Sequence, residues 1–368
     1  MHALTVNTGS TSVKLALYDI SSPDAPALLH HERHAEPQPD PHRVLAELAT
    51  RLRPAPQVIA HRIVHGGTRF VQPTPLGPET LAALAELSPL APLHNPQALR
   101  WVEGARDTWG AQTRQIAVFD TAFFARLPRV AAEYALPPDL GSKLGVRRYG
   151  FHGIAHEDMW RGWCGLYPDL TRGGRLITLQ LGGGCSIAAI ERGQPLDTSM
   201  GFSPLEGLVM ETRAGDLDAA IVPYLEHRLS LTGAEIVRRL NTESGLAGVS
   251  GSPTDPGALL ADPAPDAQFA VELYCYRIRK YLGAYLAVLG GCDGIVFGGG
   301  VGEHVPGVRA RALAGLSWAG IALDPALNNA ARGGAARINE ANSSVRVHVA
   351  AVDEELALAR AAAAQAHG

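Results

Sequence analysis

A strand–turn–strand pattern occurs twice in this 368-residue chain. The first copy, "LTVNTGSTSVKLALYDI" (4–20), has two apolar runs on either side of a turn of small polar residues. The second copy, "RLITLQLGGGCSIAAIERG" (175–193), has the same arrangement, and a shift of 174 residues places Ser12 on Ser186. The two copies share few identical residues, but their patterns agree. The sequence therefore predicts two structurally similar halves.

The residues of these turns allow two interpretations. Asn, Gly and Ser are ordinary residues of surface turns. Alternatively, small side chains let backbone N–H groups approach an anion, and Lys14 in the first copy adds a positive charge, as expected of a phosphate-binding turn. Two facing hairpins of this kind would favour the phosphate interpretation.

Length, composition and charge exclude several classes of protein. The chain is long enough for two domains, and 46% hydrophobic with 18% charged residues is typical of a globular protein. A net charge of −4 without a basic run argues against nucleic-acid binding. No stretch approaches the roughly 20 apolar residues of a membrane helix. We therefore expect a protein that binds neither nucleic acid nor membrane.

The N-terminus and the cysteines indicate a compartment. The chain begins directly with a strand pattern rather than a secretory signal. Four cysteines without CxxC spacing fit a reducing environment. We therefore expect a cytoplasmic protein.

Strand and helix patterns alternate along the chain. Asn95, as a capping residue before Pro96, predicts a helix to about Trp109, and helical spacing of apolar residues predicts another over 267–289. A last helix begins near Asp353. Four apolar runs, one of them the start of the second copy, predict strands: "VIAHRIVHGG" (58–67), "RQIAVFDTAF" (114–123), "RLITLQLGGG" (175–184) and "CDGIVFGGGVGE" (292–303). The pattern indicates an α/β fold, in which ligands bind beyond the carboxyl ends of the strands.

Two Pro-rich stretches, 22–41 and 252–265, are expected to be loops. The histidines of "HHERH" (30–34) would then be solvated loop residues without a metal. Two common nucleotide motifs are absent, because the chain has no GxxxxGK[ST] and the glycines at 298–302 do not have GxGxxG spacing.

Single residues at the predicted strand ends are candidates for chemistry. Arg62 and Val64 alternate onto one face, which would suit a small anion with a short alkyl tail, although an exposed arginine is an equal alternative. Asp120 could be a base, a magnesium contact or a helix cap, of which the cap is the default. His152 and His156 have the spacing of a zinc helix, but Gly153 argues against a well-formed helix and no third ligand is evident.

Eight motifs, in order over nearly the whole chain, resemble the acetate kinase family of the sugar kinase/Hsp70/actin superfamily. They are "NTGSTSVK", "HRIVHGG", "APLHNP", "VFDTAF", "RRYGFHG", "MGFSPLEGL…TRAGDLD", "GGGVGE" and "DEELALAR". The resemblance implies two duplicated ribonuclease H-like α/β domains with an active site in the cleft between them. It also implies a homodimer.

The resemblance assigns roles to residues of this sequence. The predicted catalytic residues are Arg62, His94, Asp120, His152 and Arg213, and Arg62 would also bind substrate beside an apolar pocket of Val64, Leu93, Phe151 and Pro204. Asn7 and Glu354 would hold the metal. The nucleotide and its phosphates would contact Ser10, Ser12, Lys14, Gly182, Gly183, Gly184, Asp255, Gly299, Gly300, Val301, Gly302 and Glu303.

The implied reaction is reversible phosphoryl transfer from ATP to acetate, with Mg²⁺ (or Mn²⁺), giving ADP and acetyl phosphate. A carboxylate is already a nucleophile, so the difficulty is to bring two anions together while negative charge spreads over the phosphoryl oxygens. Arginines, histidine donors and Mg²⁺ meet that need by positioning and charge stabilisation. The partners would therefore be a small carboxylate and a nucleotide.

Four positions depart from the family pattern. Gly183 and Cys185 stand in a turn that usually reads LGNGSS, Glu211 replaces a glycine, and Gly257 replaces an arginine. The chain also looks short before "HRIVHGG". These departures leave three alternatives open: a propionate-type acyl kinase, another phosphoryl donor, or a non-catalytic nucleotide-binding regulator.

The predicted domain boundaries follow from the duplication. Residues 1–121 with 354–368 would form an N-terminal domain onto which the last helix packs. Residues 122–353 would form a nucleotide-binding domain. Closure of the cleft between them would exclude water from the phosphoryl group.

Overall fold

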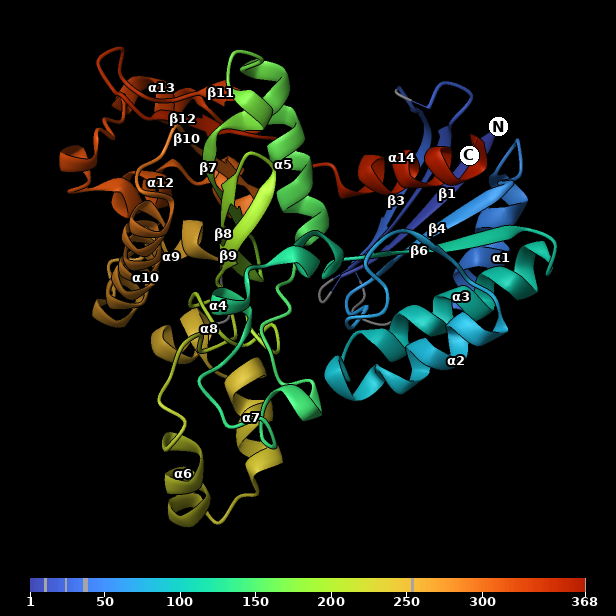
Figure 1. Cartoon of the computed structure of the whole chain (residues 1–368), viewed down its shortest axis with the longest axis horizontal. Helices are drawn as coiled ribbons and strands as arrows, with labels where there is room; N and C mark the ends of the chain where they lie inside the picture. Colours follow the sequence, from blue (N-terminus) through green and yellow to red (C-terminus); the bar gives the residue numbers. More distant parts are fainter. Residues whose placement is uncertain (10–11, 24, 36–38, 253–254, 368) are drawn as a thin grey trace. The chain divides into compact units, whose positions relative to one another are not determined.

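The computed structural model describes residues 1–9, 12–23, 25–35, 39–252 and 255–367 (Figure 1). Its internal contacts divide the chain into two compact units. The first comprises Met1–Ala125, Phe151–Ile154 and Asp353–Gly368, so it contains both chain termini. The second comprises Arg126–Gly150 and Ala155–Val352.

The first unit contains a six-stranded sheet in the order β3-β2-β1-β4-β6-β5. An antiparallel meander forms one side, and β4 and β6 extend it in parallel from β1, with a short antiparallel β5 at the edge. The strands are β1 (His2–Thr8), β2 (Val13–Asp19), β3 (Ala27–His34), β4 (Val58–Ile63), β5 (Thr74–Pro75) and β6 (Arg114–Phe119).

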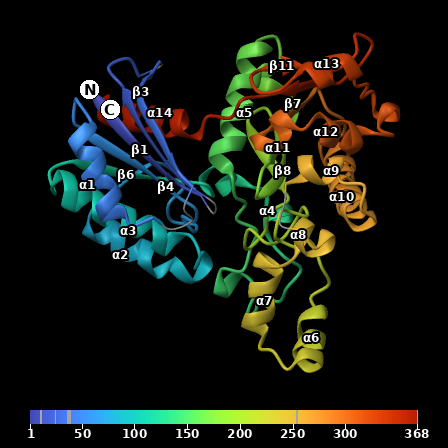
Figure 2. The same cartoon turned by 180° about the vertical axis from the view of Figure 1, so that it is seen from behind.

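Helices cover both faces of this sheet because its strands alternate between two apolar faces. Ala3, Ala16 and Val58 pack with the C-terminal helix α14 (Glu354–His367) on one face. Leu4 and Leu15 pack on the other face with α1 (Pro41–Arg51) and α3 (Asn95–Trp109), beside α2 (Pro78–Glu86). Figures 1 and 2 show α14 on the opposite face from α1 to α3.

The second unit contains another six-stranded sheet, in the order β11-β12-β10-β7-β8-β9. Its strands are β7 (Arg175–Leu181), β8 (Cys185–Glu191), β9 (Gln194–Thr198), β10 (Gly294–Gly298), β11 (Ala336–Arg337) and β12 (Arg346–Val349). Its helices are α4 (Arg129–Ala132), α5 (Gly153–Leu166), α6 (Ile221–Leu229), α7 (Gly233–Thr242), α8 (Gly245–Ser250), α9 (Pro256–Ala261), α10 (Pro265–Leu289), α11 (Gly299–His304), α12 (Pro306–Leu313) and α13 (Pro325–Ala330).

The predicted duplication is confirmed by the two sheets. Each has an antiparallel three-stranded meander, two parallel strands beside its first strand, and a short antiparallel edge strand. The hairpin turns are not identical. β1 ends at Thr8 and β2 begins at Val13, whereas the connection between Leu181 and Cys185 is one residue shorter, so no single shift matches both strands.

Several expectations about local structure were wrong. The supposed loop 22–41 contains β3, and Glu32 on that strand accepts hydrogen bonds from His30 and His34. The supposed loop 252–265 contains α9. The predicted helix over 95–109 is confirmed, but its capping position is His94, and the side chain of Asn95 bonds instead to the backbone of His65.

The helices predicted over 267–289 and from Asp353 are confirmed by α10 and α14. Among the described residues, no helix combines the length and apolarity that a membrane crossing requires.

Candidate active site

Arg62 is the centre of a buried charged cluster in the first unit. It lies on β4, and its Nε and Nη2 donate to the carboxylate of Asp120, directly after β6, at 2.6–3.1 Å. Its Nη1 donates to Asn7 Oδ1 at 3.0 Å and to Glu354 Oε2 at 3.3 Å. The side chains of Arg62 and Asp120 are only 10% and 1% exposed. Four residues predicted for the site therefore meet at the carboxyl ends of neighbouring strands.

Glu355 extends this cluster towards the first hairpin. Its Oε1 accepts from Asn7 Nδ2 at 2.6 Å and lies 3.4 Å from Lys14 Nζ. Asn7 Nδ2 also donates to Glu354 Oε2 at 2.8 Å. Because both glutamates begin α14, the C-terminal helix fixes the amide of Asn7 and brings a carboxylate to Lys14.

Burial and charge act differently on the two carboxylates beside Arg62. Burial raises the pKa of Asp120, although the positive charge of Arg62 opposes this shift. Burial works against ionisation of Glu354, but the charge of Arg62 and the hydrogen bond from Asn7 bring the pKa of Glu354 below its usual value. The pKa values of the two neighbouring carboxyl groups therefore shift in opposite directions, upward for Asp120 and downward for Glu354.

The chemistry of this cluster fits a divalent cation. Three carboxylates (Asp120, Glu354, Glu355) face two cations (Arg62, Lys14), which leaves one uncompensated negative charge. Within the described ranges, no three His, Cys, Asp or Glu side chains converge as a closed metal site. Mg²⁺ does not need such a site, because it binds through one or two protein oxygens, water and phosphate. Asn7 Oδ1 and the Glu354 carboxylate could supply these oxygens.

Two predicted histidines also lie in the first unit. His94 precedes α3 and His152 precedes α5, and both are half-buried. The backbone N–H of His152 donates to the carboxylate of Asp120. His152 adopts a left-handed conformation with φ 57°, so α5 begins after it, and the expectation that Gly153 would prevent a helix was wrong.

The apolar residues predicted around the acid differ in burial. Val64 and Phe151 are 6% and 1% exposed, and His65 packs edge-on against Phe151 with ring centroids 5.6 Å apart. Leu93 is 62% exposed, so it contributes little apolar surface to the buried group. Pro204 belongs to the second unit.

Arg213 is a buried cation of the second unit. Its Nη1 donates to the carbonyl oxygen of Pro204 at 3.3 Å and lies 3.7 Å from the sulfur of Met210. Burial lowers the pKa of Arg213. No carboxylate among the described residues forms a salt bridge with its guanidinium. This arginine is therefore suited to an anionic ligand.

The second hairpin turn uses its carbonyl groups in protein contacts. Gly182 N–H donates to Gly184 O at 3.0 Å, Glu211 N–H donates to Gly183 O at 3.2 Å, and the thiol of Cys185 donates to Gly182 O. Three of the departures from the family pattern (Gly183, Cys185, Glu211) therefore lie in one place. Of the first hairpin, Gly9 N–H donates to Ser12 O at 2.9 Å and Ser12 is buried, whereas Ser10 lies outside the described residues.

The glycine-rich segment after β10 forms a short helix, α11, so the predicted strand run 292–303 ends at Gly298. Gly299 begins α11 with φ 75°, and a Cβ there would lie 2.5 Å from Leu181 O, so only glycine fits against the end of β7. The predicted contacts Gly300, Val301, Gly302 and Glu303 continue α11. Asp255 caps α9 by accepting from the N–H groups of Gly257 and Ala258, which occupies one oxygen of the carboxylate predicted to bind nucleotide.

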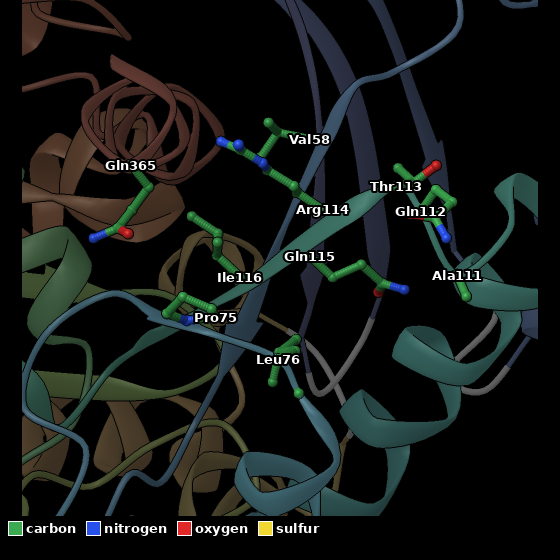
Figure 3. A pocket seen from close by; sticks show the side chains of 11 residues that line it. Val58, Pro75, Leu76, Ala111, Gln112, Thr113, Arg114, Gln115, Ile116 and Gln365 are labelled. Carbon is green, nitrogen blue, oxygen red and sulfur yellow. The ribbon is translucent and has the colours of Figure 1, made fainter. Parts of the chain in front are cut away.

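A cavity of about 350 Å³ in the first unit is separate from the charged cluster (Figure 3). Val58 and Arg114, which line it, begin β4 and β6, whereas Arg62 and Asp120 stand at the opposite ends of these strands. Gln365, near the end of α14, also lines the cavity. The cavity is therefore not the site of the predicted chemistry.

Comparison with known proteins decides the family. The profile of the acetokinase family matches residues 43–360. The chain belongs to the acetokinase family. An acetate kinase of Solibacter usitatus is 42% identical over 82% of this chain and 74% of its own length, and one of Bacteroides fragilis is 39% identical over 98% of both chains.

Solved structures of acetokinase relatives have the same fold. An acetate kinase of Porphyromonas gingivalis superposes with a TM-score of 0.87 at 33% identity, and a propionate kinase of Francisella tularensis with 0.89 at 31% identity. Each covers 98% of both chains. The fold is therefore the α/β fold of the sugar kinase, Hsp70 and actin type, and the protein is a kinase, a phosphotransferase with a carboxyl group as acceptor.

The sequence analysis assigned no role in the site to three residues that shape it. Glu355 is buried against Asn7 and Lys14, and the pair of glutamates at the start of a helix was the available signal. Gly153 packs against the backbone of Asp120, and its N–H donates to Asp120 O at 2.8 Å. Gly245, with φ 63°, lies against the backbone of Arg213, where no Cβ would fit.

Proposed function

We propose that this member of the acetokinase family is an acetate kinase, which transfers a phosphoryl group reversibly from ATP to acetate. The observation that carries the proposal is the buried hydrogen bonding of Arg62 to Asp120, Asn7 and Glu354. Such a fixed guanidinium offers paired donors to phosphate or carboxylate oxygens. The matched acetate kinases, at 39–42% identity, support the same substrate.

The proposed roles follow from the chemistry of each group. Arg62 and Arg213 act on the transferring phosphoryl group and the acid, because each is a buried cation suited to oxygen anions. His94 and His152 donate to the phosphoryl oxygens, and Asp120 orients Arg62. Val64 and Phe151 offer a small apolar surface, joined by Pro204, for the methyl group of acetate.

We propose that Glu354 and Asn7 hold Mg²⁺ together with substrate phosphate and water. The bound ion would neutralise phosphate charge. Glu354 suits this task because the pKa of its carboxyl lies below the usual value, so the group remains ionised at neutral pH. Mn²⁺ prefers the same oxygen ligands and is an expected substitute.

The hairpin turns and α11 are the proposed nucleotide-binding elements. In the turn at 182–184, the carbonyl groups and the Gly182 amide are committed to protein contacts, and the amides of Gly183 and Gly184 are the groups proposed to approach phosphate. Ser10, Ser12, Lys14 and Asp255 complete the proposed contacts. We further propose that the two compact units are the functional domains, that they close on the substrates, and that the enzyme is a homodimer, as the resemblance implies.

A trapping assay tests the proposal. Purified protein, Mg-ATP and acetate are incubated with hydroxylamine, which converts acetyl phosphate into a coloured hydroxamate. We expect hydroxamate that depends on all three components. If Mg-ATP binds in calorimetry but no short carboxylate gives hydroxamate with ATP or with any other phosphoryl donor, the protein is the non-catalytic nucleotide-binding regulator instead.

Propionate is the second candidate acid, because the Francisella tularensis propionate kinase superposes with a TM-score of 0.89. One methylene group changes binding by only about 1–3 kcal/mol in an apolar pocket, so partial activity on both acids is expected. The ratio of kcat/KM for acetate and propionate decides between them. Replacing ATP by other nucleoside triphosphates or by pyrophosphate in the same assay tests whether Gly183, Glu211 and Gly257 accompany another phosphoryl donor.

A further inference from the structure

The loop that carries Pro204 and Arg213 is fixed at its start by residues 134–149, which precede α5. It leaves β9 after Thr198, and Arg148 Nη1 donates to the carbonyl oxygens of Thr198 at 3.0 Å and Ser199 at 3.1 Å. The backbone N–H of Tyr149 donates to Gly201 O at 3.0 Å. The loop spans residues 199–216, and three hydrogen bonds to backbone carbonyl oxygens hold its beginning.

Glu206 joins the middle of this loop to the same segment. Its Oε1 accepts from Arg148 Nη2 at 2.6 Å, and its Oε2 accepts a short hydrogen bond from the hydroxyl of Tyr134. The Tyr134 oxygen in turn accepts from Phe202 N–H at 2.8 Å. We name the side chains of Tyr134, Arg148 and Glu206 the loop clamp. Each member of the clamp makes at least two hydrogen bonds.

Gly201 is the glycine that makes the loop clamp possible. A Cβ at this position would overlap both Glu206 Oε2 and the Tyr134 hydroxyl. Any larger residue would therefore separate the carboxylate from its donor. The absence of a side chain at Gly201 is a steric condition for the clamp.

The far end of the loop is closed independently. Asp216 Oδ1 accepts from Gly207 N–H at 2.9 Å, and Asp216 N–H donates to Gly207 O at 3.0 Å. The hydroxyl of Tyr281, on α10, donates to Asp216 Oδ2 at 2.8 Å. Arg213 lies within this closed segment, and its guanidinium donates to Pro204 O, two residues from Glu206.

We propose that the loop clamp is a positioning device for acid binding: Tyr134, Arg148 and Glu206 fix Pro204, and Pro204 fixes the guanidinium of Arg213. This inference rests on the proposed function of Arg213 and Pro204 in binding the acid. The clamp residues touch neither substrate in this scheme. They act on the acid through the backbone of the loop, so their loss should affect the acid more than the nucleotide.

Two variants test the clamp. In Glu206→Gln, the amide NH₂ faces either Arg148 or Tyr134, so one of the two donors loses its acceptor. Tyr134→Phe removes the hydroxyl and with it two hydrogen bonds. The matched controls are Glu157→Gln, in a surface pair with Arg161, and Tyr224→Phe, at a position 62% exposed. If Glu206→Gln does not fold, Tyr134→Phe carries the test.

The first measurement is amide hydrogen exchange without substrate, which does not depend on activity. We expect faster exchange of peptides within 199–216 in both clamp variants and in neither control. The second measurement is steady-state kinetics. We expect KM for the acid to rise about ten- to a hundredfold, as for a group displaced by about an ångström, with KM for the nucleotide unchanged.

Three outcomes would overturn the proposal: unchanged exchange in 199–216, unchanged KM for the acid despite faster exchange, or equal rises in both KM values. Wild-type protein that phosphorylates no acid would refute the proposed function and, with it, the role in acid binding. Faster exchange in the variants would then still show that the clamp holds the loop.

Discussion

At the scale of single residues, the arginines of the two units differ in what balances their charge. Arg62 is bonded to Asp120 and Glu354, and the charges of both raise its pKa although burial opposes this. Among the described residues, the guanidinium of Arg213 donates to a carbonyl oxygen and lies near a sulfur, without a carboxylate partner, and burial lowers its pKa. Arg62 is thus oriented by protein carboxylates, whereas Arg213 forms no salt bridge with a carboxylate in the described part of the chain and is suited to bind an anion.

Arg62→Lys is expected to lower kcat/KM by about 10²–10³, the cost of losing a fixed donor to a developing charge. Lysine keeps the positive charge but cannot bond to Asp120, Asn7 and Glu354 at once, because it lacks the planar fork of arginine. Steady-state kinetics check this, with Arg69→Lys at an exposed position as the control. Activity within about twofold of wild type would mean that charge alone suffices at position 62.

At the scale of elements, apolar runs predicted the central strands of the first sheet and β7, β8 and β10 of the second sheet, but not β3 at the edge of the first sheet or β12 within the second. β3 reads "ALLHHERH", and its half-buried positions are His30, Glu32 and His34, so it lacks the apolar alternation of β1 and β2. An edge strand needs apolar contacts on fewer sides, and tertiary pairing overrides its weak propensity. The pairing of Arg62 with Asp120 was likewise invisible to spacing, because it depends on β4 lying beside β6. Only the resemblance brought these two residues together.

Gly153→Ala is expected to lower kcat by about tenfold or more, because displacement of a positioned group by about an ångström is costly. A Cβ at Gly153 would overlap Asp120 O, and it would lie 2.9 Å from Phe123 Cβ. The start of α5 and the end of β6 would therefore separate. Kinetics of this variant, compared with Gly162→Ala on the same helix where a Cβ meets nothing, check the prediction. Equal activity of the two variants would contradict it.

A buried histidine between β4 and β6 makes stability depend on pH. Burial lowers the pKa of His61 to about 4, although its hydrogen bond with Gln115 opposes this, whereas an unfolded histidine titrates near about 6.5. Below about pH 6.5 the unfolded chain therefore binds a proton that the folded chain does not. This contribution is complete above about pH 6.5 and is lost as the pH falls towards 4, by about 1.4 kcal/mol per pH unit.

When the pH is lowered from about 7 to about 5, the melting temperature of His61→Gln is therefore expected to fall less than that of wild type. Thermal unfolding followed by circular dichroism measures this difference. His42→Gln, at a side chain 49% exposed, is the control and should behave as wild type. Parallel losses in His61→Gln and wild type would show that His61 does not carry the pH dependence.

At the scale of the whole molecule, the two duplicated halves draw on different parts of the chain. The second sheet is built from one continuous stretch, 175–349, whereas the first unit needs both termini. The domain layout predicted from the duplication had the last helix packing back onto the N-terminal half. Leu358, Ala359, Ala362 and Ala363 of α14 are fully buried in the cluster beneath the first sheet. The same helix supplies Glu354 and Glu355 to the charged cluster, so folding of the first unit and assembly of the site depend on one element.

A chain that ends at Val352 is therefore expected to lose the folded first unit as well as activity. Removal of α14 uncovers one apolar face of the sheet, including Ala3, Ala16 and Val58, and leaves Arg62 and Lys14 without the glutamates. Limited proteolysis should then cleave within 1–125 while the second unit resists, and co-expression of a peptide spanning 353–368 should restore protection. A chain shortened only to Ala366, which keeps the buried residues of α14, is the control. If the chain ending at Val352 resists proteolysis in its first 125 residues as wild type does, α14 is not needed to fold the first unit, and its two glutamates serve the site alone.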